Sequence, residues 1–143
     1  MEEYMKLALK QACIAAKKGE VPIGAIIVKN NKVIAKAYNL KEKKNISIYH
    51  AEILAIQKAC KKLKSWRLNG CTMYVTVEPC AMCCGAIKES RISKLIYGTK
   101  NKNTGFVASK SNFFEDSKII ILDGICELEC RNLMQEFFKK KRI

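Results

Sequence analysis

Long hydrophobic runs are absent from this 143-residue sequence. The longest apolar stretches, IGAIIV and IIIL, are far shorter than the roughly 18 residues that a helix needs to cross a bilayer. The first ten residues, MEEYMKLALK, lack the apolar core of a secretory signal. We therefore expect a cytoplasmic protein without membrane association. Its eight cysteines would stay reduced and serve as metal ligands, nucleophiles or core residues.

Acidic side chains are scarce. The 13 Asp and Glu residues are outnumbered by 27 Lys and Arg, which leaves a net charge of +14. Such an excess favours polyanions such as nucleic acid, because basic side chains release the counterions of a phosphate backbone. It is equally consistent with a lysine-rich, solvated surface. Charge alone leaves both interpretations open.

Repeats, linkers and low-complexity segments are also lacking, and the length fits one domain, residues 1–143. Asn30 and Asn31 separate two β-rich runs and predict a hairpin turn, and the polar segment 40–47 predicts a loop. Further strands are expected over 71–77, 92–98 and 118–122, and helices over 2–18, 49–63, 78–90 and 125–142. This alternation favours an α/β fold, a three-layer α/β/α sandwich around a mixed five-stranded sheet.

Histidine occurs once, at position 50, where the second predicted helix begins. A catalytic zinc site takes three protein ligands and keeps a fourth position for water. Cys80 and Cys83, spaced i and i+3 at the start of another helix, can bind the same ion as His50. Pro79 suits the first turn of that helix because its missing N–H costs nothing there. Helix N-termini also favour thiolates.

The other cysteines are weaker candidates for a metal site. Cys84 is rotated by about 100° from Cys83 in a helix and should face elsewhere. Core packing is the better interpretation for the remaining thiols, since free cysteine is usually buried. These are Cys13, Cys60, Cys71, Cys126 and Cys130.

Glu52 lies two residues after His50, so the two side chains do not share a face of a regular helix. We expect Glu52 to approach a zinc-bound water from another direction. Such a water has a pKa near 7, and an adjacent carboxylate can carry its proton. This suits hydrolytic deamination, in which hydroxide attacks the ring carbon that bears an exocyclic amine and ammonia leaves.

H-A-E followed by P-C-x-x-C, each at a helix start, is the signature of zinc deaminases, although neither fragment is decisive alone. One alternative is a Cys-His hydrolase in which Cys80 or Cys83 is the nucleophile and His50 the base. Another is a non-catalytic RNA-binding protein in which zinc only joins two helices.

Several segments in order resemble the cytidine deaminase superfamily, and most closely the tRNA-specific adenosine deaminases of the TadA type. They are GEVPIGAIIVKNNKVIA, HAEILAI, SWRLNGCTMYVTVEPCAMCCGAI, RISKLIYG, NTG and LMQEFFKKKR. The resemblance implies the cytidine deaminase-like fold and one Zn²⁺ per chain. It also implies conversion of the wobble adenosine (position 34) of a tRNA anticodon stem-loop to inosine, by attack at C6, and a homodimer.

The same resemblance assigns roles to individual residues. His50, Cys80 and Cys83 would hold zinc and Glu52 would shuttle protons. Asn39 would hydrogen-bond the target base, and the remaining substrate-binding residues would be Val21, Pro22, Ala51 and Pro79. Candidate RNA contacts are Lys100, Asn101, Lys102, Phe137, Phe138, Lys139 and Lys140.

The sequence departs from the family pattern at three places. Tyr49 precedes the histidine where a small residue or Thr is common, Asn101 stands where Asp is frequent, and segment 106–117 is shorter. These departures concern the fit of the substrate more than the metal chemistry. The nearest alternative within the superfamily is a zinc deaminase of a free base or nucleotide, such as guanine or deoxycytidylate.

Overall fold

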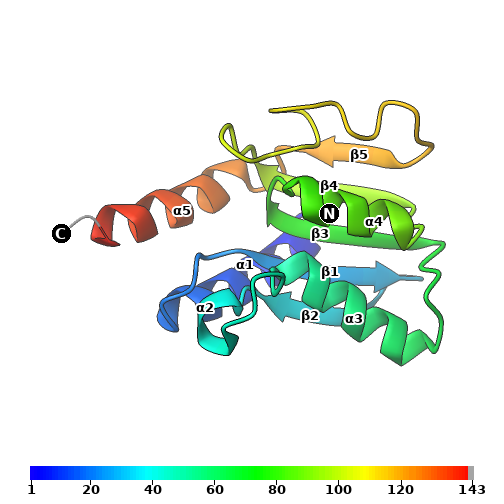
Figure 1. The fold of residues 1–143 in the computed structure, drawn as a ribbon, viewed down its shortest axis with the longest axis horizontal. Helices are drawn as coiled ribbons and strands as arrows, with labels where there is room; N and C mark the ends of the chain where they lie inside the picture. The colour runs from blue at the N-terminus through cyan, green and yellow to red at the C-terminus, as the bar shows by residue number, and fades with distance from the viewer. Residues whose placement is uncertain (142–143) are drawn as a thin grey trace.

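The computed structural model describes residues 1–141 and contains one five-stranded sheet with helices on both faces (Figure 1). In chain order the elements are α1 (Glu2–Lys17), β1 (Gly24–Lys29), β2 (Lys32–Tyr38), α2 (Lys41–Lys44), α3 (Ala51–Leu63), β3 (Cys71–Val77), α4 (Ala81–Glu89), β4 (Lys94–Thr99), β5 (Ile120–Asp123) and α5 (Glu127–Lys141). The strand order is β2-β1-β3-β4-β5. The predicted mixed sheet is therefore confirmed.

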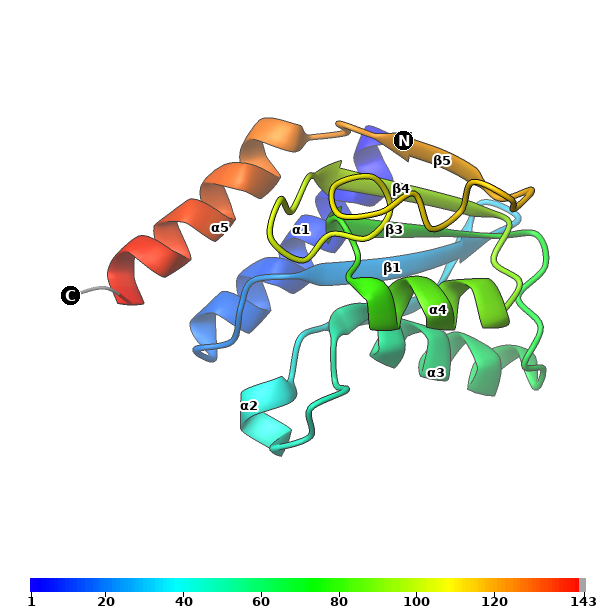
Figure 2. The same ribbon diagram turned by 45° about the horizontal axis from the view of Figure 1, so that its top comes forward.

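Helices α3 and α4 cover one face of the sheet and α1 and α5 the other (Figure 2), and a layer of apolar side chains lies on each face. Because side chains alternate along a strand, neighbouring residues of one strand enter opposite layers. Ile27 packs in the layer under α3 and α4, whereas Ile26 packs in the layer under α1 and α5. The three-layer α/β/α sandwich predicted from the sequence is the observed architecture.

The hairpin between β1 and β2 turns at Asn30 and Asn31, as predicted. Both residues have positive φ, 50° and 61°, which asparagine tolerates better than most residues. Lys29 pairs with Lys32 across the turn. Local turn chemistry was therefore sufficient to place this element.

The direction of the strands brings two helix starts together. β1 is antiparallel to both β2 and β3, so β2 and β3 run in the same direction and end at the same edge of the sheet. The chain leaves β2 toward α3 and leaves β3 directly into α4. His50 and Cys80 are the residues immediately before these two helices.

Three local predictions differ from the structure. Residues 41–44 form the short helix α2 within the predicted loop, because buried Glu20 accepts hydrogen bonds from two of its backbone amides. Pro79 precedes α4 instead of lying in its first turn, since Cys80 is the N-cap. Cys13 is exposed on α1 and is not a core residue, because α1 turns that position toward solvent.

The other predicted core cysteines range from buried to partly exposed. Cys71 and Cys130 are buried, whereas Cys60 and Cys126 are intermediate. The closing helix extends through Lys141, and its predicted end at residue 142 lies outside the described residues. None of the helices within residues 1–141 has the length and apolar character needed to cross a membrane.

Candidate metal centre and substrate cavity

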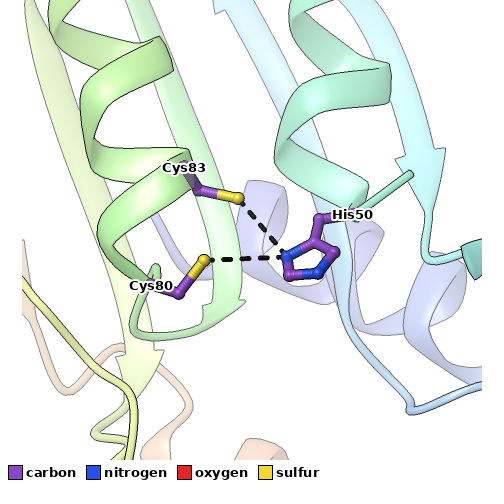
Figure 3. Close-up of side chains that lie close together, drawn as sticks. All are labelled: His50, Cys80 and Cys83. Atoms are coloured by element: carbon purple, nitrogen blue, oxygen red, sulfur yellow. Dashed lines mark hydrogen bonds between the residues drawn. The ribbon is translucent and has the colours of Figure 1, made fainter. Parts of the chain in front are cut away.

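The side chains of His50, Cys80 and Cys83 converge between the starts of α3 and α4 (Figure 3). Nδ1 of His50 lies 3.7 Å from Sγ of Cys80 and 3.6 Å from Sγ of Cys83. Tetrahedral bonds to zinc of about 2.3 Å from sulfur and 2.05 Å from nitrogen would separate the two donor atoms by about 3.6 Å. The donor set and its spacing therefore fit zinc.

The backbone at both helix starts leaves the donor side chains free to meet. His50 and Cys80 are N-caps with extended φ and ψ, and neither side chain caps its own helix. Each therefore points away from its helix axis and toward the other (Figure 3). The positive ends of the helix dipoles also favour a thiolate there.

Hydrogen bonding distributes the protons of this centre unequally. Hydrogen bonds from Cys83 and His50 lower the pKa of Cys80 to about 4. Hydrogen bonding to Cys80, followed by burial, raises the pKa of the Cys83 thiol above its ordinary value. The hydrogen bond with Cys80 also raises the pKa of His50. These shifts favour the thiolate form of Cys80 and the protonated form of Cys83.

Glu52 is buried in the first turn of α3, with 3% of its surface exposed. Its Oε1 has no hydrogen-bond partner among the described residues, and burial raises the pKa of this carboxyl to about 7. A buried polar atom without a partner is costly, so such atoms are rare in folded proteins. Its position next to His50, Cys80 and Cys83 makes Glu52 the candidate proton acceptor of this centre.

A cavity of about 860 Å³ opens onto the centre at His50 and Ala51. Its walls come from segments that are far apart in the sequence. The residues that line it are Val21, Ile23, Asn39, Lys41, His50, Ala51, Val77, Thr99, Lys100, Asn101, Lys102, Asn103, Thr104, Glu127, Arg131, Met134, Gln135 and Phe138. This volume lies within the range typical of small-molecule sites, about 300–1,000 Å³.

The predicted substrate residues divide into two groups. Val21, Asn39 and Ala51 line the cavity. Pro22 and Pro79 are buried and do not line it. The Asn39 amide donates to the carbonyl of Val21 at 3.3 Å and accepts from the amide of Lys41 at 3.1 Å. Asn39 therefore holds two parts of the cavity wall together.

The predicted RNA contacts also divide into two groups. Lys100, Asn101, Lys102 and Phe138 line the cavity. Oδ1 of Asn101 accepts from the amides of Asn103 and Thr104, each at 3.2 Å, so this side chain shapes its own loop. The other three residues, Phe137, Lys139 and Lys140, lie in the last turns of α5 and do not line the cavity.

Sequence reasoning missed several residues at the cavity. Lys41 and Arg131 contribute basic side chains from α2 and α5, and their sequence context is that of any solvent-facing residue. Glu78 did leave a signal in the sequence. An acidic residue between an apolar strand and Pro79 is unusual, and this could have identified it as a buried carboxylate with a specific role. Residues that meet only through the fold leave no spacing signal.

Comparison with known proteins places the chain among deaminases. The sequence model of the MafB19-like deaminase family matches residues 1–142. A tRNA-specific adenosine deaminase of Bacillus subtilis (strain 168) is 43% identical over 145 residues, which covers 99% of this chain and 90% of the relative.

Two solved structures extend the comparison. One comes from studies of A-to-I editing by tRNA:A34 deaminases at the wobble position of transfer RNA. It superposes with a TM-score of 0.90 at 38% identity, and the match covers 93% of this chain and 99% of that chain. The X-ray structure of guanine deaminase from Bacillus subtilis superposes with a TM-score of 0.66 at 39% identity, and covers 69% of this chain and 64% of that chain. Together with the His-Cys-Cys cluster, these similarities show that the chain is a deaminase and belongs to the family of tRNA-specific adenosine deaminases.

Proposed function

We propose that this enzyme converts the wobble adenosine, position 34 of a tRNA anticodon, to inosine. The observation that carries the proposal is the geometry of the centre: three donors at zinc spacing next to a buried carboxylate oxygen without a partner. The similarity to tRNA-specific adenosine deaminases supports the substrate. Residues 1–143 would act as a single catalytic domain.

His50, Cys80 and Cys83 would hold one Zn²⁺ per chain. Zinc bound by three protein ligands lowers the pKa of a water molecule to about 7 and so supplies a nucleophile at neutral pH. Glu52 accepts a proton at its carboxylate and delivers it to the purine ring nitrogen, and a second transfer protonates the leaving amine. The C6–N bond breaks, a C6–O bond forms, and adenosine plus water gives inosine plus ammonia.

The cavity would hold the target base while its wall residues position it. Asn39 and the backbone N–H of Ala51 would contact the base or the reacting carbon, and Val21 would flank it, whereas buried Pro22 does not line the cavity. A base in an anticodon loop can be splayed out at less cost than a paired one. Phosphates next to it would meet Lys100 and Lys102, which stand at the rim.

The proposed partner is the anticodon stem-loop, bound by a homodimer. Asn101, Phe137, Phe138, Lys139 and Lys140 would extend the RNA contacts from the cavity along α5. Sedimentation of the purified protein, alone and with the stem-loop, tests the dimer. A monomer in both conditions would contradict that part of the proposal.

The decisive experiment incubates purified protein with a panel of anticodon stem-loops and assays for inosine. We expect inosine at the wobble position of at least one member. Glu52→Gln is the matched control, because it removes the proton carrier but keeps the size of the side chain. This variant should lose at least a hundredfold in turnover, the order expected for a general acid–base, while it retains metal and RNA binding.

Other outcomes of the same assay would redirect the assignment. Deamination of free guanine or deoxycytidylate without activity on any stem-loop would favour the small-base alternative, for which the similarity to guanine deaminase is the supporting observation. Full activity of metal-free protein would favour a Cys-His hydrolase. One zinc per chain, lost together with activity on chelation, would exclude it.

A further inference from the structure

Glu20 and Glu78 are buried carboxylates outside the metal centre, with 1% and 3% of their surfaces exposed. Neither forms a salt bridge within residues 1–141. Their hydrogen-bond partners are almost entirely backbone amides. Each carboxylate adjoins the cavity in sequence, since Glu20 precedes Val21 and Glu78 follows Val77.

Glu20 fixes the start of α2. Its Oε1 accepts from the amide of Glu42 at 3.0 Å, and its Oε2 accepts from the amide of Lys43 at 2.6 Å. A helix of four residues has almost no stability of its own, because forming the first turn is unfavourable. Glu20 therefore determines where the backbone places Lys41, which lines one wall of the cavity.

Glu78 fixes another part of the cavity wall, the loop that follows β4. Its carboxylate accepts from the backbone amides of Asn101, Val107, Ala108 and Ser109 and from the Ser109 hydroxyl. The same loop pairs with the metal-binding segment, because the amide of Phe106 donates to the carbonyl of Pro79 at 2.9 Å. Gly105 permits this contact, since a Cβ there would lie 2.4 Å from the Glu78 carboxyl. This loop carries Lys100 and Lys102 into the cavity.

Two buried negative charges next to a cavity for RNA are unfavourable unless their hydrogen bonds stabilise the cavity walls. Burial of a charge is costly, and both carboxylates would repel an incoming phosphate. Hydrogen bonds to a carboxylate are stronger and more directional than those between neutral groups. These hydrogen bonds fix the backbone segments that carry the cavity lysines.

We infer that Glu20 and Glu78 are positioning residues, which fix the backbone segments that carry Lys41 on the one hand and Lys100 and Lys102 on the other, so that these lysines meet the phosphates that flank the target nucleotide. This inference rests on the proposed function, because it assumes an RNA substrate. Within the described residues, neither carboxylate lines the cavity or hydrogen-bonds to His50, Cys80 or Cys83. They act by keeping the lysines in place before the RNA arrives, which reduces the ordering cost of binding.

The first test is amide hydrogen exchange on the intact protein, which needs no activity. Glu42 and Lys43 are exposed residues, yet their amides should be protected in the wild type. Glu20→Ala, which removes both acceptor oxygens, should remove protection at these two amides only. Glu78→Ala should remove it at Val107, Ala108 and Ser109. Unchanged protection in both variants would overturn the inference.

The second test measures kcat and KM on the stem-loop as a function of salt. Glu20→Gln should raise KM severalfold with kcat within twofold, and should reduce the slope of log KM against log salt by about 1, as for the loss of one phosphate contact. Glu115→Gln is the matched control, because it removes the same charge from an exposed position and should change neither quantity.

A double-mutant cycle separates positioning from general loss of structure. If Glu20 acts through Lys41, Glu20→Gln should add little to the KM effect of Lys41→Ala. Independent effects that multiply would contradict the inference. If Glu78→Gln does not fold, two measurements still test the inference. One is the Glu20–Lys41 cycle, and the other is Gly105→Ala, whose added methyl group displaces the Glu78 carboxyl.

The two proposals fail in different ways. Wild-type protein that neither binds nor deaminates any stem-loop would refute the proposed function. Active wild type, together with Gln variants that keep the wild-type KM and salt slope, would refute the positioning role alone.

Discussion

At the scale of single residues, the metal centre depends on which of two adjacent thiols faces the histidine. Cys83 and Cys84 are both fully buried. Sγ of Cys83 lies 3.6 Å from Nδ1 of His50, whereas the Cys84 thiol donates to the carbonyl of Pro79 at 3.6 Å and packs in the core under α3 and α4. The 100° rotation between neighbours in a helix places Cys83 at the candidate metal centre and Cys84 in the core.

Replacing Cys83 should remove the metal, whereas replacing Cys84 should leave the metal content unchanged. Cys83→Ala removes a donor, so metal measured by atomic emission should fall from one equivalent to near zero and activity should fall with it. Cys84→Ala should keep the metal and lose about 1 kcal/mol of unfolding free energy, a typical core effect. Equal metal content in the two variants would contradict the assigned donor set.

Thiol reactivity gives a second prediction at this scale. Cys13 is exposed, whereas burial raises the pKa of Cys130 to about 12. The thiolate is the reactive form, so a raised pKa keeps Cys130 protonated and inert below that pH. Iodoacetamide at pH 8 should modify Cys13 within minutes and leave Cys130 intact, as read by peptide mass spectrometry. Comparable labelling of both in native protein would show that α5 is not packed as described.

At the scale of elements, glycine decides how closely α5 can approach the sheet. A Cβ on Gly98 of β4 would lie 2.4 Å from Sγ of Cys130 and 2.7 Å from the carbonyl oxygen of Thr76. Cys130 is the one buried residue of α5. The C-terminal part of α5 extends beyond the sheet, so this contact near its start sets the position of Phe138 on the cavity (Figure 1).

Two glycine-to-alanine substitutions should therefore change the free energy of unfolding in opposite directions. Gly98→Ala overpacks the contact with α5 and should lower the unfolding free energy by about 1–3 kcal/mol. Gly85→Ala lies within α4, where a Cβ meets nothing within 4 Å, and should raise it by roughly 0.5–1 kcal/mol through helix propensity. Urea unfolding followed by circular dichroism measures both values. A neutral Gly98→Ala would mean that α5 docks less tightly.

At the scale of the whole molecule, some of the basic residues behind the net charge of +14 line one cavity. Lys41, Lys100 and Lys102 line it from two sides, while many other lysines cover the remaining surface. A general excess of positive charge favours polyanions from any direction, and we propose that the cavity lysines act where the target base would enter.

Salt should weaken RNA binding in a measurable way. If the three cavity lysines each neutralise one phosphate, log K should fall with log salt with a slope of about −2 to −3. Fluorescence anisotropy on Glu52→Gln, which cannot consume the substrate, gives the slope. Lys41→Ala should reduce its magnitude by about 1. A slope unchanged by that substitution would place the phosphates elsewhere.

Much of this protein could be predicted from local sequence signals. The Asn30-Asn31 turn, the strands and the long helices follow from turn chemistry and apolar periodicity, which act over a few residues. The donor set His50, Cys80 and Cys83 was predicted from residue type and position at two helix starts, and the structure brings all three together. The turn, the strands and the long helices depend on neighbours in the chain, so the sequence by itself determined them. The residue types of the donor set were also visible in the sequence, but the strand directions bring the two helix starts together.

The rest was decided by the tertiary structure. α2 forms because a carboxylate more than 20 residues earlier in the chain accepts its amides, and Lys41 and Arg131 share a cavity because the sheet order brings their segments together. Cys13 is exposed because α1 turns that position toward solvent. Such contacts depend on which distant segments become neighbours, and no local pattern of residues encodes that information.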